Sequence, residues 1–306
     1  MSIPEKLLII QDLSKLSQTE LARLLGVSFP SLNSWINGKS QPRAGKIASI
    51  DKLYQKYSGL DVIGPDAISA KKLIIDKKRK KYKNLVNFIL ERADIYDQLL
   101  LSFTYNTNSI EGSTLTENET AAIIFEGITI KNKNMVEHLE AKNHQLAFNY
   151  IFERMDIGVN IDEIYILKLH EILMHGIKND AGVYRNHGVR IVGSNVPTAN
   201  YLKIPDRMKE LVKMINSDTK DIVSLVALVH STFEQIHPFS DGNGRVGRLI
   251  MASILIRNNY APAVIKKQKK SLYYKCLQKS QLENENTMLE EFICDAIIAG
   301  FGFLED

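Results

Sequence analysis

The sequence predicts a mostly α-helical protein with one β-hairpin, preceded by a small all-α module. Helices are predicted because apolar residues recur three or four positions apart through most of the 306 residues, and because Ser/Thr-x-x-Glu capping boxes precede two of these stretches. The hairpin is predicted by residues 184–204, where alternating apolar residues flank a Gly-Ser turn.

Composition and charge indicate a globular protein long enough for two domains. The chain is 44% hydrophobic, and its formal charge of +4 lies entirely in the first 60 residues, which hold eight basic and four acidic residues. Two cysteines are too few for a disulfide framework. With no signal peptide and no apolar run of membrane-spanning length, we expect a cytoplasmic location and no membrane partner.

Residues 1–60 have the pattern of a helix-turn-helix module. Ser17 and Glu20 form a capping box that begins one helix, and Ser28 can cap a second helix after a turn at Gly26. This pattern resembles the phage-repressor class, in which the second helix enters the major groove of DNA. The resemblance makes five residues candidates for DNA contact: Ser31, Asn33, Ser34, Lys39 and Arg43.

A second interpretation of this module stays open. Its second helix has no arginine for a bidentate contact with guanine, although Asn33 can read an adenine edge. Because a fold alone does not fix a function, the module could instead dock a protein or dimerise, which would make the chain a homodimer.

Residues 61–92 are expected to form a linker helix after the boundary at Gly64-Pro65. The lysine-rich run at residues 77–83 fits the solvated face of that helix, and contact with nucleic-acid phosphate is the alternative.

The stretch from His237 to Arg248 places a base, a carboxylate, glycines and two guanidinium groups within twelve residues. Its glycines precede a helical pattern, so unpaired N–H groups and the positive end of a helix dipole would face a ligand, which suits phosphate oxygens. Arg245 and Arg248 lie three residues apart, on nearly the same face of the helix, and each guanidinium can donate paired hydrogen bonds to an anion. Asp241 can hold a cation such as Mg²⁺, and His237 can accept a proton from a hydroxyl.

Every position of this stretch matches His-Pro-Phe-x-(Asp or Glu)-Gly-Asn-Gly-Arg-x-x-Arg, so residues 93–306 resemble the Fic family, with a core at about 165–256. The resemblance implies a helical Fic-type bundle that transfers AMP from ATP to a Ser, Thr or Tyr hydroxyl of a target protein. It implies His237 as the base and Asp241 as the ligand of the cofactor Mg²⁺. It assigns the binding of the ATP phosphates to Gly242, Asn243, Gly244, Arg245 and Arg248.

A helix near residues 95–112 is predicted to end in Glu111, where a carboxylate faces the negative end of the helix dipole. Residues 107–112 match (Ser or Thr)-x-x-x-Glu-(Gly or Asn), the inhibitory motif of the same family. The resemblance implies that Glu111 pairs with Arg248 and keeps it from the last phosphate of ATP. A glutamate that merely ends a helix is the alternative.

The predicted hairpin corresponds by resemblance to the flap that aligns a target segment by main-chain pairing. Its target-docking residues would be Ile191, Val192 and Gly193, and a purely structural hairpin is the alternative.

Two other functions stay open. Glu111 acting on a water molecule would make the chain a hydrolase that removes AMP from a target. A DNA-binding transcriptional regulator with a nucleotide-sensing core is the other alternative, although a sensor has no need of the base His237.

Overall fold

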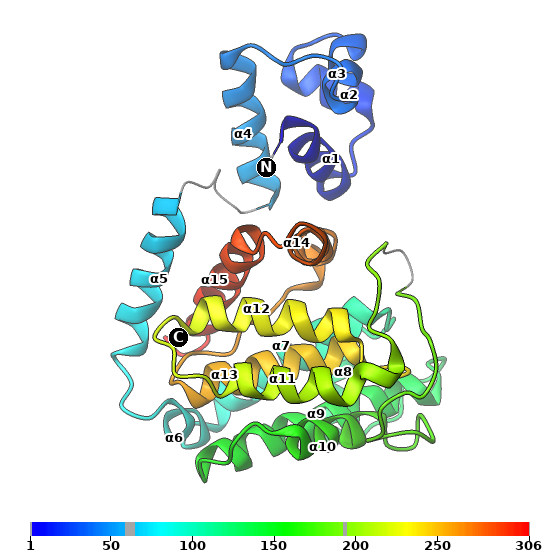
Figure 1. Ribbon diagram of the computed structural model, residues 1–306, viewed down its shortest axis with the longest axis vertical. Helices are drawn as coiled ribbons and strands as arrows, with labels where there is room; N and C mark the ends of the chain where they lie inside the picture. Colours follow the sequence, from blue (N-terminus) through cyan, green and yellow to red (C-terminus); the bar gives the residue numbers. More distant parts are fainter. Residues whose placement is uncertain (1, 59–64, 192–194, 306) are drawn as a thin grey trace.

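The computed structural model describes residues 2–58, 65–191 and 195–305 (Figure 1). Every regular element within these residues is a helix, so the mostly α-helical prediction is confirmed. None of the described helices combines the length and the apolar character needed to span a bilayer.

Four helices form the N-terminal module at one end of the molecule (Figure 1): α1 (Ile3–Ser14), α2 (Gln18–Leu25), α3 (Phe29–Ile36) and α4 (Ala44–Ser58). The capping box at the start of α2 is formed, because the Ser17 N–H donates to Glu20 Oε2 at 2.8 Å and the Glu20 N–H donates to Ser17 Oγ at 3.3 Å. Helix α2 and helix α3 pack together beside a core that includes the buried side chains of Leu21, Leu32 and Trp35. The predicted helix-turn-helix is therefore present.

Helix α5 (Pro65–Arg79) is held against the rest of the chain by its lysines. Lys71 lies 2.6 Å from Asp295 and Lys72 lies 2.5 Å from Asp221, while Lys78 and Lys81 both pair with Glu305. Within the basic run, Lys78 and Lys81 are thus ion-paired rather than simply solvated, because Glu305, more than 220 residues later in the chain, packs beside them.

The remaining helices pack around α13 in a larger bundle. Their bounds are α6 (Leu85–Leu90), α7 (Ala93–Glu111), α8 (Glu117–Ala121), the π-helix η1 (Ala122–Glu126), α9 (Met135–Asp156), α10 (Glu163–Met174), the 3₁₀ helix η2 (Tyr201–Lys203), α11 (Ile204–Ile215), α12 (Ile222–Ile236), α13 (Asn243–Arg257), the 3₁₀ helix η3 (Lys267–Lys269), α14 (Lys270–Glu283) and α15 (Thr287–Gly302).

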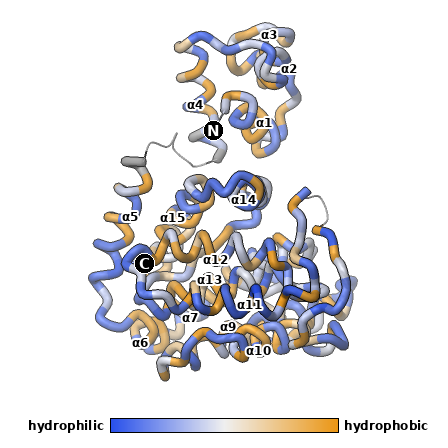
Figure 2. Tube along the Cα trace, viewed as in Figure 1, coloured by the Kyte–Doolittle hydropathy of each residue, from blue (hydrophilic) through white to orange (hydrophobic). Residues whose placement is uncertain are grey.

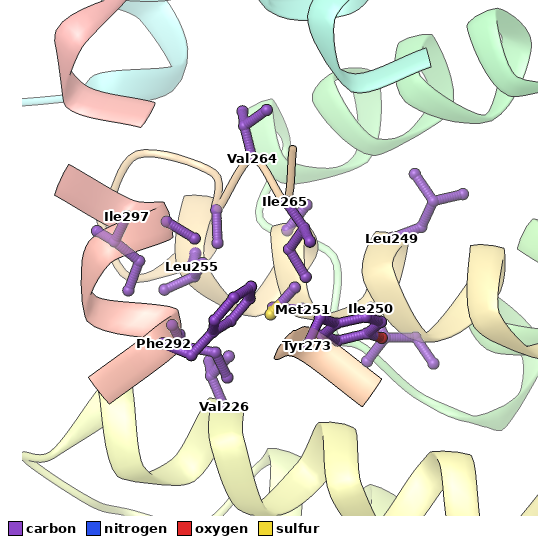
Figure 3. Packing of buried hydrophobic residues seen from close by; sticks show 14 of the residues in the cluster. Val226, Leu249, Ile250, Met251, Leu255, Val264, Ile265, Tyr273, Phe292 and Ile297 are labelled. Carbon is purple, nitrogen blue, oxygen red and sulfur yellow. The ribbon is translucent and has the colours of Figure 1, made fainter. Parts of the chain in front are cut away.

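Helix α13 is central because α7, α9, α10 and α12 all pack on it. Every residue from 245 to 256 is buried; most of them are apolar, as expected of a helix that is enclosed on all sides, and the two arginines are ion-paired. Figure 2 shows apolar residues along α12, α13 and α15 inside the bundle. In Figure 3, Met251 and Leu255 of α13 lie beside Tyr273 of α14 and Phe292 of α15. This packing fixes the start of α13, where the phosphate-binding pattern lies.

The predicted β-hairpin is not found in the described residues. Residues 184–191 and 195–200 are irregular, η2 and α11 replace the second predicted strand, and Val192 and Gly193 lie outside the described residues. A two-stranded hairpin is marginal without a further strand, and Pro205 at the start of α11 favours a helix there. The two arms meet instead through the Thr198 hydroxyl, which donates to the Val189 carbonyl at 2.9 Å.

Candidate active site

A solvent-open cavity of about 540 Å³ lies at the start of α13. It is lined by residues of the end of α7, the loop before η2, the end of α12, residues 237–244 at the start of α13, and one side of α14. Its walls include most of the predicted site: Glu111, Ile191, His237, Asp241, Gly242, Asn243 and Gly244. The sequence-predicted residues thus converge, although up to 133 positions separate them.

His237 follows directly after α12, where Pro238 prevents the helix from continuing. Its backbone is left-handed, with φ 50 and ψ 61, and its Nδ1 lies 3.3 Å from the Glu234 carbonyl. Only a protonated Nδ1 can donate to that carbonyl, so Nε2 carries the lone pair. Burial lowers the pKa of His237, which keeps the ring neutral and able to accept a proton.

The loop after His237 is held by groups that face the core. Phe239 is fully buried and stacks on the His170 ring, with 3.7 Å between ring centroids. The Asn243 side chain accepts from the Phe239 N–H at 2.9 Å and donates to the Phe239 carbonyl at 2.8 Å. These two bonds close the loop, so Asn243 shapes the site as well as lining it.

His170 supports the loop from α10. Its Nδ1 accepts the Gly182 N–H at 2.8 Å, so its Nε2 is protonated and donates to the Asp241 carbonyl at 3.1 Å. Burial lowers the pKa of His170 to about 4, which preserves this arrangement at neutral pH. Sequence reasoning missed this residue, because its spacing from other histidines matches no metal or catalytic motif.

Arg248 is buried behind the cavity wall, with 1% of its surface exposed, and it contacts Glu111, which lines the cavity. Its Nη2 lies 2.5 Å from Glu111 Oε1, and its Nε donates to Thr107 Oγ1 at 3.1 Å. Burial is the largest single influence and lowers the pKa of Arg248, but Glu111, Tyr273 and Tyr274 together outweigh it and raise that pKa. Both partners on α7 come from the stretch that matches the inhibitory motif.

Arg245 is paired mainly with α9, although its Nη2 also lies 3.8 Å from Asp241 Oδ1 in the cavity wall. Its Nη1 donates to Glu140 Oε1 on α9 at 2.7 Å, and its guanidinium is not part of the cavity wall. A buried guanidinium is commonly stabilised by a carboxylate, and Glu140 supplies one for Arg245. Direct contact between Arg245 and a phosphate would therefore require another rotamer.

Glu234 is a second carboxyl in the cavity wall that sequence reasoning missed. Its side chain is buried, and Oε1 has no hydrogen-bond partner among the described residues. Burial raises the pKa of Glu234 to about 8, with Arg248 opposing and Glu111 adding to the shift. At neutral pH this carboxyl is mostly protonated.

The candidate DNA contacts lie on or just after α3. Ser31, Asn33 and Ser34 are half-buried, and each hydrogen-bonds within the module, to Ser28, Gln18 and Ser40 respectively. Lys39 and Arg43 are exposed beyond the end of that helix.

Comparisons with known proteins give matches both for the N-terminal module and for the residues around the cavity. Residues 160–255 match the model of the Fic/DOC family, and residues 10–59 match a helix-turn-helix model. The chain is 32% identical over 194 residues to the protein adenylyltransferase Fic of Drosophila sechellia, and 31% identical over 225 residues to the protein of the same name from Drosophila virilis. These alignments cover 62% and 72% of this chain but 39% and 46% of the relatives, so the chain spans less than half of their length.

Solved structures share the fold. A Fic domain containing signaling protein from Bacteroides thetaiotaomicron superposes with a TM-score of 0.65 at 25% identity, covering 77% of this chain and 98% of that one. A Fic family protein from Desulfovibrio desulfuricans superposes with a TM-score of 0.66 at 26% identity, covering 79% of this chain and 74% of that one. Fic-1 from C. elegans gives 0.66 over 94% of this chain and 84% of that one; at 18% identity, this likeness concerns the fold alone.

Proposed function

We infer that this chain, in which residues 160–255 form a Fic/DOC-family domain and residues 10–59 a helix-turn-helix, is a protein adenylyltransferase. It transfers AMP from ATP to a Ser, Thr or Tyr hydroxyl of a target protein. The observation that carries this proposal is the neutral His237, whose Nε2 lone pair is available in a cavity that the first turn of α13 also lines.

In the proposed reaction, His237 Nε2 accepts the proton of the target hydroxyl while that oxygen forms a bond to the α-phosphorus of ATP. The bond from this phosphorus to the oxygen bridging the β-phosphate breaks, and pyrophosphate leaves. The N-terminal N–H groups of α13 have no partners within the helix and suit the phosphate oxygens. Gly242, Asn243 and Gly244 are the residues we assign to them.

Asp241 is the residue that would hold Mg²⁺. Its side chain is half exposed; Oδ1 accepts the Gly242 N–H at 2.7 Å, and Oδ2 lies 3.3 Å from Lys178 Nζ. The described residues contain no cluster of three metal-ligating side chains. One carboxylate is nevertheless enough for Mg²⁺ that arrives with a nucleotide, because phosphates and water complete its coordination. The bound ion would neutralise phosphate charge.

We assign two further roles. Arg248 would bind the γ-phosphate, and Glu111 competes with that phosphate for the same guanidinium, so the default state is inhibited. Ile191 in the cavity wall, together with Val192 and Gly193, would dock the target segment.

The test uses Glu111→Gly and the double variant Glu111→Gly/His237→Ala, each incubated with Mg²⁺, a candidate target and ATP labelled on either the α- or the γ-phosphate. Glu111→Gly should transfer the α-label to protein and not the γ-label, and the double variant should transfer neither. Transfer of the γ-label would identify a kinase. Undiminished α-labelling by the double variant would exclude His237 as the base.

A further inference from the structure

Arg185, in the segment before α11, is a buried arginine that the proposed reaction does not use. Only 3% of its surface is exposed. Its Nε donates to the His237 carbonyl at 2.7 Å, and its Nη2 donates to the carbonyls of Ala199 at 2.7 Å and Ile236 at 3.4 Å. Its Nη1 donates to the His187 carbonyl at 2.5 Å. One guanidinium thus binds four main-chain carbonyls.

Two of these carbonyls belong to the end of α12. The last carbonyls of a helix have no intrahelical partner, and a cation there is favoured by the helix dipole. Arg185 supplies both the donors and the charge at the residue where the chain turns into the left-handed conformation of His237. The main-chain N–H of Arg185 donates to the Pro238 carbonyl at 3.0 Å, so the residue after His237 is fixed as well.

The other two carbonyls lie on either side of the loop that reaches the cavity. His187 precedes the cavity residues Arg190 and Ile191, and Ala199 follows them. The Ala199 N–H also donates to the Gln235 carbonyl at 3.3 Å, so this side of the loop is fixed to α12 twice. Both ends of the loop are therefore attached, through one side chain, to the backbone of the candidate base.

This arginine has no carboxylate within ion-pair distance in the described residues. Buried charges are normally paired with an opposite charge, and burial accordingly lowers the pKa of Arg185. An apolar residue could fill the same space without that penalty, but it could not bind four carbonyls that point toward one centre.

We propose that Arg185 is a positioning residue that fixes the catalytic base His237 in register with residues 187–191, which reach the cavity wall where the target segment would dock. The inference rests on the proposed function and adds to it a link between the target-binding loop and the base. A misplacement of about 1 Å between reacting groups can reduce turnover on the order of 100-fold. Loss of the link should therefore lower kcat for the target and leave nucleotide binding intact.

The experiment compares Arg185→Lys and Arg185→Gln, both made in the active Glu111→Gly parent. Lysine keeps the charge but concentrates its donors on one nitrogen, so it cannot serve four carbonyls. Glutamine removes the charge as well. The control is Arg207→Lys on α11, whose side chain is 61% exposed and pairs with Glu210 of the same helix. Each variant is first checked for cooperative thermal unfolding and for ATP affinity by calorimetry.

We expect both Arg185 variants to bind ATP within about twofold of the parent and to lose roughly 100-fold in kcat for AMP transfer. The pH profile distinguishes the effect of the Arg185 charge from the effect of its hydrogen-bond geometry. The charged groups that act on His237 in the parent, which lacks Glu111, are Arg185, which lowers its pKa, and Asp241, which raises it. Arg190, Lys270 and the buried carboxyl of Glu234 also lie in the cavity wall. Arg185→Gln should move the acidic limb of kcat/KM to higher pH, because a cation that lowers the pKa of His237 is gone, whereas Arg185→Lys should leave the limb in place.

Parental kcat in either folded variant would overturn this inference while leaving the proposed function intact. Absence of AMP transfer in the Glu111→Gly parent would instead overturn the proposed function. If Arg185→Gln fails to fold, Arg185→Lys still tests whether the hydrogen-bond geometry of the guanidinium is needed, because lysine keeps the charge and most of the aliphatic stem.

Discussion

Glu111 Oε1 and Arg248 Nη2 lie 2.5 Å apart, although 137 residues separate them in the chain. The pair lies directly beside residue 244 and leaves room there only for a glycine. A Cβ at that position would collide with Glu111 Oε1 and lie 3.2 Å from Arg248 Nη1. A longer side chain at residue 244 is therefore incompatible with this conformation of Glu111, so the glycine is needed for the Glu111–Arg248 pair as well as for the proposed phosphate contact.

The first prediction concerns the close approach of α12 to α13 at Gly247. A Cβ there would lie 2.6 Å from Glu234 Oε1 and 3.1 Å from Phe233 Cδ1. Because overpacking a core is destabilising, Gly247→Ala should lower the free energy of unfolding by about 1–3 kcal/mol, measured by urea denaturation. Gly302→Ala is the control, since its Cβ would meet nothing within 4 Å. Equal stability of the two variants would contradict the packing.

The second prediction concerns Glu234, whose pKa burial raises to about 8 from an ordinary 4.5. Between these two values the unfolded chain has lost a proton that the folded chain keeps, so this residue makes the protein less stable as pH rises. Glutamine cannot ionise. The stability of Glu234→Gln relative to wild type should therefore increase from pH 5 to pH 8, by at most about 1.4 kcal/mol per pH unit. Parallel urea midpoints across this range would show that Glu234 ionises normally.

The third prediction concerns the pH at which His237 becomes protonated and can no longer act as a base. Burial, together with the positive charge of Arg185, lowers the pKa of His237 below 6.5, while the Glu234 carbonyl opposes the shift. The neutral ring then persists into mildly acidic solution. In the Glu111→Gly variant, kcat/KM for AMP transfer should fall only below pH 6.5, as followed by initial rates from pH 5 to pH 8. An acidic limb centred above pH 6.5 would rule out this environment for the base.

The fourth prediction concerns DNA binding by the N-terminal module. Lys39 and Arg43 are exposed beyond α3, so each should contribute one phosphate contact to a duplex. Changing either to glutamine should weaken binding and reduce the slope of log affinity against log salt by about 0.9. Lys52→Gln on α4 is the matched control, because Lys52 lines a separate hollow with Leu24 and Leu53. A mobility shift that is absent even at low salt would favour protein docking or dimerisation.

Local rules predicted the parts of the site that depend on neighbouring residues. The end of α7 at Gly112 and the end of α12 before Pro238 follow from capping and from proline chemistry. The hairpin prediction was wrong because pairing of two strands needs support from outside the segment. Local alternation carries no information about that support.

Other features depend on partners that lie far away in the chain. Arg245 and Arg248 look equivalent in sequence, yet Glu140 of α9 binds one and Glu111 of α7 binds the other. Likewise, nothing near Arg185 or His170 indicates that one will bind the carbonyls around His237 and the other the carbonyl of Asp241. Such roles become visible only when the tertiary structure places the partners together.

The fifth prediction tests the central claim, that Glu111 holds Arg248 away from the nucleotide. The measurement is the initial rate of α-label transfer at saturating ATP for wild type, Glu111→Gly and the control Glu117→Gln, an exposed glutamate at the start of α8. A hydrogen bond to a charged group stabilises by about 1.5–3 kcal/mol, so its removal should raise the rate roughly 10- to 150-fold. Glu117→Gln should match wild type. A Glu111→Gly rate equal to or below that of wild type would contradict the account.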